Sequence, residues 1–327
     1  MEPYQIALVV VGGIVLLYTI LAFFAGRFFL KQAFRPVAYT LEEVKTKQTT
    51  VDNVDYSDYD NVWNKQPFEI DGTQGKLRGE YIVNPQATST PAKVAIVVHG
   101  HTQNRLITIK YATIFYNLGY NLVIYDHPYF GLSDGEFTTV GGLEARDLTL
   151  VVDFARQTFG KDSFIALHGE SMGAVTVLRV LALRSDINLV VADCPYSHAM
   201  KFFREKCRQV VPVPSFPIVD FANLISTVKY KCNFNKVDNV KVVQGTQVPI
   251  CFIHGTADPL IYYYHSQKLY QAAQNPLSEL HLFEGALHAR SHLFDPLRYT
   301  QIVSDFVTKI ENNTTNNYFY IQGDILW

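Results

Sequence analysis

Hydrophobic residues occupy the first 26 positions of the chain almost without interruption. No charged residue lies between Pro3 and Gly26, and residues 6–24 are nearly all aliphatic or aromatic. A helix needs about 20 such residues to cross the ~30 Å hydrocarbon core of a bilayer, and buried core helices are usually shorter and carry polar residues. A cleaved signal peptide is disfavoured, because no Lys or Arg leads into the run and no clear A-x-A site ends it. The pattern predicts a transmembrane helix over residues 4–26.

Polar sequence follows this span. Arg27, Lys31 and Arg35 come directly after it, and no Lys or Arg comes before it. Because positive charge resists translocation, we expect the helix to cross the membrane once, with the catalytic domain on the cytoplasmic side. Residues 27–62 are polar and become acidic toward their end, a pattern that we interpret as a juxtamembrane stalk.

Short apolar runs then alternate with longer segments from residue 63 to residue 312. The region opens with a predicted hairpin across a Gly-rich gap. Val94–Val98 is continuously apolar, as is typical of a strand covered on both faces. Such alternation predicts an α/β domain with a mostly parallel central sheet and helices on both faces. The expected strands are 66–70, 76–84, 94–98, 121–125, 163–167, 189–192, 249–253 and 279–283, and the expected helices are 105–118, 143–159, 172–184, 261–274 and 296–310.

The stretch from about residue 197 to residue 247 breaks this alternation. It is rich in Lys, Arg and aromatic residues and contains the pair Pro212-x-Pro214. We interpret it as a small helical lid inserted over the sheet edge, although an ordinary long helical connection fits the same pattern. Residues 313–327 are expected to form a C-terminal tail. The apolar lid residues that would favour medium or long acyl chains are Phe202, Phe203, Val210, Val211, Val213, Phe216, Ile218 and Val219.

One short motif in the predicted domain carries recognisable chemistry. The expected strand 163–167 leads into Gly169-Glu-Ser171-Met-Gly173, a G-x-S-x-G pattern. A serine at a tight strand-to-helix turn needs small residues two positions before and after it, since these leave room for the crowded backbone and expose the hydroxyl. Because an apolar strand precedes the motif and an apolar helix follows it, we expect Ser171 to be a nucleophile.

A serine hydroxyl is a weak nucleophile without a base, so partners are expected further along the chain. The strand 249–253 leads to Asp258, and the strand 279–283 leads to His288. The order Ser, acid, His is the one that this kind of elbow predicts, with His288 as the base and Asp258 as the acid that orients it. Asp193 and Glu284 are alternative acids, and His292 is the alternative base. We expect two other histidines to cap strand ends and support loops, namely His168 and His254.

An acyl-transfer site also needs two backbone N–H groups that face the developing oxyanion. Met172, directly after the nucleophile, would supply one of them. The loop after the strand 94–98 would supply the other, and we expect it from His101, which follows His99-Gly100.

Composition and charge narrow the class of protein. The chain has 327 residues, 48% hydrophobic and 18% charged, which is typical of a packed core and excludes a disordered chain. A net charge of −2 argues against nucleic-acid binding. Four cysteines without a C-x-x-C pair, and a His288–His292 spacing without H-E-x-x-H, argue against a metal site. We therefore expect no metal, no cofactor and no obligate protein partner.

Taken together, these motifs resemble the α/β-hydrolase superfamily, and within it the bacterial single-span membrane-anchored serine hydrolases. The resemblance covers about residues 65–312. It implies the α/β-hydrolase fold and the same five site residues, namely Ser171, Asp258, His288, His101 and Met172. The chain has His127-Pro128 where the family usually has Arg-Gly, in a loop that is structural there. The stretches that carry the resemblance are His99–Asn104, Asp126–Gly135, Gly169–Gly173, Ala192–Tyr196, His254–Asp258 and His288–Ser291.

These observations lead to one expected function and two alternatives. We expect a membrane-anchored serine hydrolase that cleaves a small-molecule or lipid acyl ester through an acyl-enzyme intermediate. A serine peptidase or amidase of the same fold is the nearer alternative. A non-catalytic binding protein on a hydrolase fold is the other, because a fold alone does not establish an activity.

Overall fold

The computed structural model describes residues 2–210 and 213–323, with side chains as far as residue 313. The chain folds into two compact units. One, the helical unit, contains the chain up to Pro36 together with His198–Asp238. The other, the sheet unit, contains Val37–Ser197 and the chain from Asn239 onward. Each unit is described on its own below.

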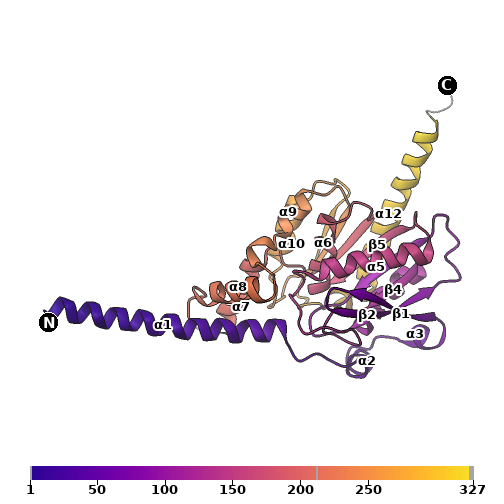
Figure 1. The fold of residues 1–327 in the computed structure, drawn as a ribbon. Helices are drawn as coiled ribbons and strands as arrows, with labels where there is room; N and C mark the ends of the chain where they lie inside the picture. The colour runs from indigo at the N-terminus through magenta and orange to yellow at the C-terminus, as the bar shows by residue number, and fades with distance from the viewer. Residues whose placement is uncertain (1, 211–212, 324–327) are drawn as a thin grey trace. The chain divides into compact units, whose positions relative to one another are not determined.

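The sheet unit is built around eight strands in the order β1-β2-β4-β3-β5-β6-β7-β8 (Figure 1). β1 pairs antiparallel with β2, and β2 antiparallel with β4, whereas all other neighbours are parallel. This confirms the predicted mostly parallel sheet. The strands are β1 Asn64–Gly72, β2 Gly75–Val83, β3 Lys93–Val98, β4 Asn121–Tyr125, β5 Phe164–Glu170, β6 Leu189–Asp193, β7 Ile250–Gly255 and β8 Glu279–Phe283.

Helices cover both faces of this sheet, as the alternation predicted. Successive side chains of a strand point to opposite faces, so Ala95 and Val97 of β3 enter one core while Val94 and Ile96 enter the other. The helices on the first face are α2 Leu41–Thr50, α3 Ser57–Asn61, η1 Arg105–Thr108, α4 Ile109–Asn117 and α12 Pro296–Gly323. Those on the second are α5 Glu144–Phe159, α6 Met172–Arg179, η2 Val180–Ala182, α9 Asn239–Gln244 and α10 Tyr264–Ala272.

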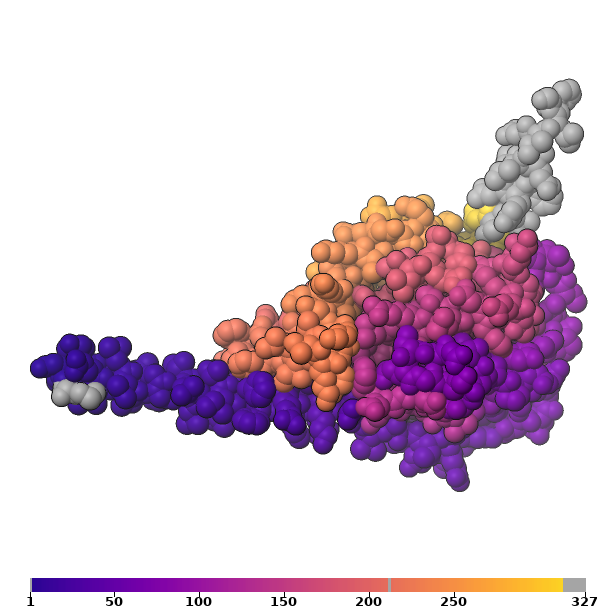
Figure 2. Space-filling view, viewed as in Figure 1, coloured from indigo at the N-terminus to yellow at the C-terminus, as the bar shows by residue number. Residues whose placement is uncertain are grey.

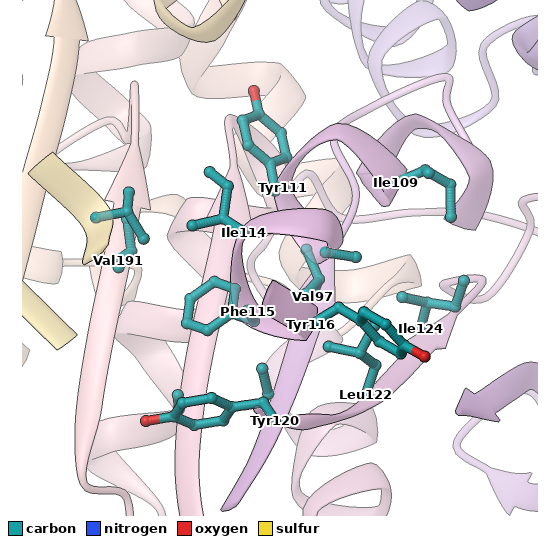
Figure 3. Close-up of a cluster of buried hydrophobic side chains, with 14 of the residues drawn as sticks. Val97, Ile109, Tyr111, Ile114, Phe115, Tyr116, Tyr120, Leu122, Ile124 and Val191 are labelled. Atoms are coloured by element: carbon teal, nitrogen blue, oxygen red, sulfur yellow. The ribbon is translucent and has the colours of Figure 1, made fainter. Parts of the chain in front are cut away.

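Aromatic side chains fill much of the first core (Figure 3). Phe115 of α4 and Tyr120, directly before β4, are fully buried and meet edge to face with ring centres 5.6 Å apart. Burying side chains of this size is the main apolar contribution to stability. α4 is thereby fixed against the sheet next to the strand ends that carry the candidate site.

The structure differs from the expected stalk at residues 27–62. Tyr56 and Tyr59 belong to the first core together with Trp63, and the Tyr56 hydroxyl donates to the Leu106 carbonyl at 2.6 Å. The segment from α2 onward is therefore part of the sheet unit. α12 also differs from the expectation, since it continues through the predicted tail to Gly323.

The helical unit contains the long apolar helix α1 Pro3–Phe34, which extends past the predicted end at residue 26. It also contains α7 Ala199–Val210, α8 Ile218–Lys229 and η3 Phe234–Lys236. A stripe at every fourth position of α1, from Ala22 to Phe34, is buried. Figure 2 shows the earlier part of α1 as an indigo rod that extends beyond α7 and α8.

A glycine allows α1 and α8 to approach each other closely. A Cβ atom added to Gly26 would lie 2.4 Å from the Ile218 carbonyl oxygen, so no other residue fits there without a shift of the backbone. Only His198–Asp238 of the expected lid, residues 197–247, belong to the helical unit. The next helix, α9, belongs to the sheet unit and packs into its second core through Val243. Val211, one of the expected apolar lid residues, lies outside the described residues.

Candidate active site

Ser171 lies in a tight turn between β5 and α6. Its backbone has φ +56° and ψ −112°, a region that side-chain-bearing residues rarely adopt and that often marks a functional turn. The flanking glycines make the turn possible. A Cβ atom on Gly169 would lie 2.3 Å from the Gly173 carbonyl oxygen, and one on Gly173 would lie 2.2 Å from the Val98 carbonyl oxygen. The G-x-S-x-G pattern is thus explained by backbone packing around Ser171.

The structure brings Ser171, His288 and Asp258 together, although they lie far apart in the sequence. The Oγ atom of Ser171 is 2.9 Å from Nε2 of His288, and Nδ1 of His288 is 2.7 Å from Oδ2 of Asp258. Ser171 follows β5, Asp258 follows β7 and His288 follows β8, so all three lie at the carboxyl ends of parallel strands. The arrangement has the hydrogen-bonded order of nucleophile, base and orienting acid.

Asp258 is a buried carboxylate with a full set of donors. Its Oδ1 accepts hydrogen bonds from the backbone N–H groups of Leu260 at 2.8 Å and Ile261 at 2.9 Å. Burial alone would raise the pKa of Asp258, but hydrogen bonds from His254 and His288 outweigh burial and hold this pKa well below its usual range. Asp258 is therefore an anion beside the His288 ring.

His254 is a second histidine on this carboxylate. Its Nε2 lies 3.2 Å from Oδ2 of Asp258 and 2.8 Å from the Ile261 carbonyl oxygen. Both neighbours are acceptors, so Nε2 carries the hydrogen and Nδ1 accepts from the Ser266 hydroxyl at 2.7 Å. We expected His254 to support a loop, and its contact with Asp258 was not predicted. The position of His254, four residues before Asp258, was a signal in the sequence for this contact.

The two expected oxyanion donors flank the nucleophile. Met172 is the first residue of α6, and N–H groups of the first helical turn have no partner within their own helix. The loop after β3 lies against the elbow, since a Cβ atom on Gly100 would lie 3.5 Å from Cβ of Ser171. His101 follows in this loop and lines the same pocket as Ser171.

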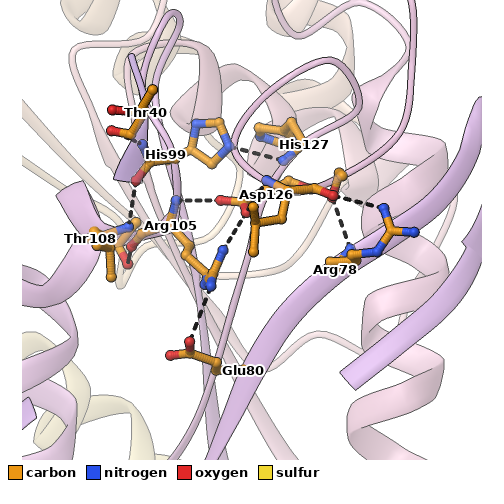
Figure 4. Close-up of polar contacts among 12 residues, drawn as sticks. Thr40, Arg78, Glu80, His99, Arg105, Thr108, Asp126 and His127 are labelled. Carbon is orange, nitrogen blue, oxygen red and sulfur yellow. Dashed lines mark hydrogen bonds and ion pairs between the residues drawn. The ribbon is translucent and has the colours of Figure 1, made fainter. Parts of the chain in front are cut away.

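A polar network holds this loop in place (Figure 4). The Asn104 side chain donates to the carbonyls of Tyr39 at 3.1 Å and Thr40 at 3.0 Å. The next backbone N–H, that of Arg105, donates to Oδ1 of Asp126 at 2.7 Å, and the Arg105 guanidinium forms ion pairs with Asp126 and Glu80. These contacts are buried or partly buried, and together they restrain the loop beside Ser171.

The pocket at Ser171 has a volume of about 270 Å³ and a wall of both polar and apolar groups. Lys110 and Glu170 line it beside His101 and His288. Lys110 Nζ lies 3.0 Å from Oε2 of Glu170, and both side chains are buried. The Tyr111 hydroxyl donates to the same oxygen at 2.5 Å. Sequence reasoning missed the Lys110–Glu170 pair, because its members are 60 positions apart and no motif connects them.

The alternative site residues lie elsewhere. Glu284 is exposed, and His292 packs between the Tyr111 and Tyr299 rings, where burial lowers its pKa to about 3. His168 is also buried, with Nε2 2.9 Å from the Tyr299 hydroxyl. Within the part of the chain that the structure describes, neither histidine forms a hydrogen bond with Ser171. Burial lowers the pKa of His168 to about 3 as well, so both rings are neutral at physiological pH.

Asp193, the main alternative acid, is fully buried. Burial raises its pKa to about 8, the Glu170 carboxylate adds to this rise and Lys110 opposes it. Within the described chain neither carboxyl oxygen has a partner of ordinary hydrogen-bond geometry, the nearby Tyr299 hydroxyl included. The backbone carbonyl of Asp193 helps to hold the turn at Ser171, since it accepts the N–H of Ser171 at 2.8 Å.

Two clusters of the described residues have metal-ligand chemistry. Cys194 lies close to Asp258 and His288, and Cys251 lies close to Glu279 and His281. Burial raises the pKa of both thiols well above its usual value, so each sulfur is protonated and a poor ligand. In the first cluster the Asp258–His288 hydrogen bond already occupies the ligand atoms.

Comparisons with known proteins identify the family of this chain. Residues 89–228 match the family described as serine aminopeptidase, S33. The chain is 31% identical to the uncharacterized protein YqkD of Bacillus subtilis over 252 residues, which cover 76% of this chain and 81% of YqkD. It is 26% identical to human alpha/beta hydrolase domain-containing protein 17B over 193 residues, 58% of this chain and 57% of that protein.

Solved structures show the same kind of fold. The Pyrococcus furiosus esterase Pf2001 superposes with a TM-score of 0.63 at 25% identity, over 78% of this chain and 96% of the esterase. The sheet order, the serine at the turn between β5 and α6 and these likenesses converge on one conclusion: the chain belongs to the α/β-hydrolase superfamily.

Proposed function

We propose that this hydrolase is a membrane-anchored serine esterase with Ser171, His288 and Asp258 as its catalytic triad. The observation that carries the proposal is the continuous hydrogen-bonded chain from Ser171 Oγ through His288 to Asp258, at 2.9 Å and 2.7 Å. The strained backbone of Ser171 supports it, because this conformation holds the hydroxyl at the mouth of the turn. A non-catalytic binding protein has no need of such an arrangement.

The proposed mechanism follows from the positions of these groups. His288 Nε2 takes the proton as Ser171 Oγ attacks the ester carbonyl, and the N–H groups of His101 and Met172 stabilise the oxyanion. The imidazolium, balanced by the Asp258 carboxylate, returns the proton to the departing alcohol and leaves an acyl-enzyme. His288 then deprotonates water, which attacks the acyl carbon, and the acid leaves as Ser171 regains its proton.

Peptide or amide cleavage is the second candidate activity. It is favoured by the match of residues 89–228 to a family described as serine aminopeptidase. The same triad serves both reactions. In amide cleavage, however, the leaving group is an amine, and its nitrogen needs more complete protonation by His288 than the oxygen of an alcohol does. The likeness to an esterase structure, at 25% identity, favours esters.

Turnover of matched substrates separates these two candidates. Purified chain is assayed with p-nitrophenyl esters and with aminoacyl p-nitroanilides, and the intact protein is examined by mass spectrometry during ester turnover. We expect kcat/KM for esters to exceed that for anilides by orders of magnitude, with a transient acyl adduct on Ser171. Faster anilide cleavage would replace the esterase proposal with the peptidase one. Absence of turnover and adduct would favour a binding protein.

We further propose that α1 is a retained membrane anchor. α1 has 32 residues, and its most apolar window has a mean hydropathy of 2.7 with 6% of its residues buried, so the helix is long and apolar enough to cross a bilayer. A signal sequence would satisfy the same criterion. Arg27, Lys31 and Arg35 at its C-terminal end favour a cytoplasmic sheet unit.

Fractionation of cells that produce the chain with a C-terminal tag tests both statements. We expect the full-length chain in the membrane fraction after carbonate washing, and we expect external protease to leave the tagged body intact. A shortened, soluble product would identify a cleaved signal sequence. Cleavage of the body in intact cells would reverse the orientation.

A further inference from the structure

The helix α8 of the helical unit carries its polar and apolar residues on unexpected sides. Phe216, one residue before its N-cap, is 67% exposed, and Leu224 and Val228 on α8 are 55% and 64% exposed. A helix on the surface of a water-soluble protein places polar side chains outward and apolar ones inward. The outer face of α8 is apolar instead.

The polar side chains of α8 are used for contacts within the helical unit. Asp220 forms an ion pair with Arg204 of α7 at 3.0 Å. The Asn223 side chain accepts the N–H of Phe234 at 2.7 Å. The Ser226 hydroxyl is buried and donates to a backbone carbonyl, that of Cys232, at 2.6 Å. Ahead of the exposed Lys229 at its C-terminal end, the outward face of α8 is thus left to its apolar residues.

α8 also lies directly against α1. The Phe23 and Phe221 rings meet edge to face with centres 5.6 Å apart. The Tyr18 hydroxyl donates to the Phe216 carbonyl at 3.0 Å, which satisfies a backbone acceptor ahead of α8. Satisfied backbone groups are a requirement for any segment in hydrocarbon.

We propose that α8 and Phe216 lie in the membrane beside α1, with Leu224 and Val228 in contact with lipid. This inference rests on the anchoring role proposed for α1. Its partner is the hydrocarbon and inner headgroup region of a phospholipid bilayer. The packing of α8 directly against α1, whose own side chains Phe24 and Phe28 are 58% and 63% exposed, favours this partner.

The contacts also predict depth. Residue numbers rise in the same direction on both helices, because Phe216 meets Tyr18 and Tyr230 meets Phe34. Phe216 is therefore at the level of Tyr18, about 13 Å along the helix from the first cation, Arg27, at 1.5 Å per residue. Val228, next to Lys229 at the end of α8, lies near the headgroups. The expected order of depth is Phe216, then Leu224, then Val228.

Site-specific fluorescence on the full-length chain in phosphatidylcholine–phosphatidylglycerol liposomes tests this order. A single nitrobenzoxadiazole label is placed through Phe216→Cys, Leu224→Cys or Val228→Cys, since all four native cysteines are buried. Leu16→Cys, on the part of α1 beyond these contacts, reports on the anchor. Leu183→Cys on the sheet unit is the matched control, because Leu183 is also a leucine and is also 55% exposed.

Quenching by doxyl groups on lipid chains is compared with quenching by aqueous iodide. We expect lipid quenching at positions 16, 216 and 224, weaker quenching at 228 and iodide quenching alone at 183. Labels at 216 and 224 that behave like 183, while position 16 is quenched by lipid, would overturn the inference and leave the anchor intact. Absence of lipid quenching at position 16 as well would overturn both. Reaction of Ser171 with a fluorophosphonate shows that each variant is folded.

A second copy of this chain is the other partner that an apolar face admits. In that case the label at Leu224 would be shielded from iodide and from lipid quenchers alike. Leu224→Cys chains would also form disulfide-linked dimers in liposomes at low protein-to-lipid ratio. That pair of results would overturn the lipid assignment.

Discussion

His254 donates a hydrogen bond from Nε2 to Oδ2 of Asp258 at 3.2 Å, on the same oxygen that His288 approaches at 2.7 Å. Two histidines therefore fix one carboxylate, and only His288 reaches Ser171. His254 has no access to solvent and is held from its other side by the Ser266 hydroxyl. We infer that His254 positions Asp258.

Removal of this donor should slow the chemical step. His254→Phe retains a ring of similar size but leaves Asp258 with fewer donors, so the carboxylate is free to shift. A small misplacement of reacting groups can cost about 10²-fold, and we expect kcat to fall by roughly 10–100-fold with a smaller change in KM. His254→Gln keeps an amide donor and should lose less. Equal losses in both variants, with an equal fall in melting temperature, would indicate a purely structural role.

The identity of the acid can be tested by two isosteric changes. Asp258→Asn removes the anion that orients and balances His288, so kcat should fall by about 10⁴-fold. Asp193→Asn should stay within a few-fold of the unchanged protein, because its carboxyl is not bonded to His288. Steady-state ester kinetics on both variants give the comparison. A larger loss in Asp193→Asn would assign the acid to Asp193.

Stability should depend on pH through Asp193. Its pKa is raised to about 8 in the folded chain, while an unfolded Asp titrates near its usual value of about 3.9. Between these pH values the folded state holds a proton that the unfolded chain has released. Each such proton lowers the free energy of unfolding by about 1.4 kcal/mol per pH unit as the pH rises. The contribution is complete below pH ~4 and lost by pH ~8.

Melting temperatures from pH 5 to pH 9 check this prediction. The melting temperature of Asp193→Asn minus that of the unchanged protein should increase as the pH rises. Asp162→Asn, at an exposed position, is the control and should show a constant difference. A constant difference in Asp193→Asn as well would mean that Asp193 is ionised in the folded state at all these pH values.

Acyl-chain preference is predicted from the apolar lid. Phe216, Val210 and Val213 are exposed in the helical unit, whereas Phe202, Phe203, Ile218 and Val219 are buried. If the exposed Val210 and Val213 contribute to acyl binding, kcat/KM should rise from p-nitrophenyl acetate to the octanoate. A steady fall with chain length would instead fit the small pocket at Ser171, with its volume of about 270 Å³, and indicate short acyl groups.

Much of the sheet and the candidate site was predictable because periodicity and strand-end chemistry are local signals. β4 at Asn121–Tyr125 and β8 at Glu279–Phe283 have the predicted bounds, and β3, β6 and β7 differ from prediction by at most two residues at either end. Ser171, Asp258 and His288 were each marked by the strand that precedes them, and parallel strands place their carboxyl ends at one edge.

The remaining features depend on contacts that no local pattern encodes. Val44, Tyr56 and Trp63 enter the core from a stretch whose many acidic and polar residues hide this face. Lys110 and Glu170 become partners only when α4 packs beside β5. The inverted polarity of α8 likewise emerges from its contacts with α1 and α7, since its sequence alone reads as an ordinary amphipathic helix.

The central claim, that Ser171 is the nucleophile of a serine hydrolase, is tested most directly by a fluorophosphonate probe. The purified chain is labelled, digested and mapped by mass spectrometry, in parallel with Ser171→Ala and with Ser89→Ala at an exposed serine. We predict a single labelled peptide containing Ser171, unchanged labelling of Ser89→Ala, and neither label nor ester turnover in Ser171→Ala. Labelling or turnover that persists in a folded Ser171→Ala protein would contradict the assignment.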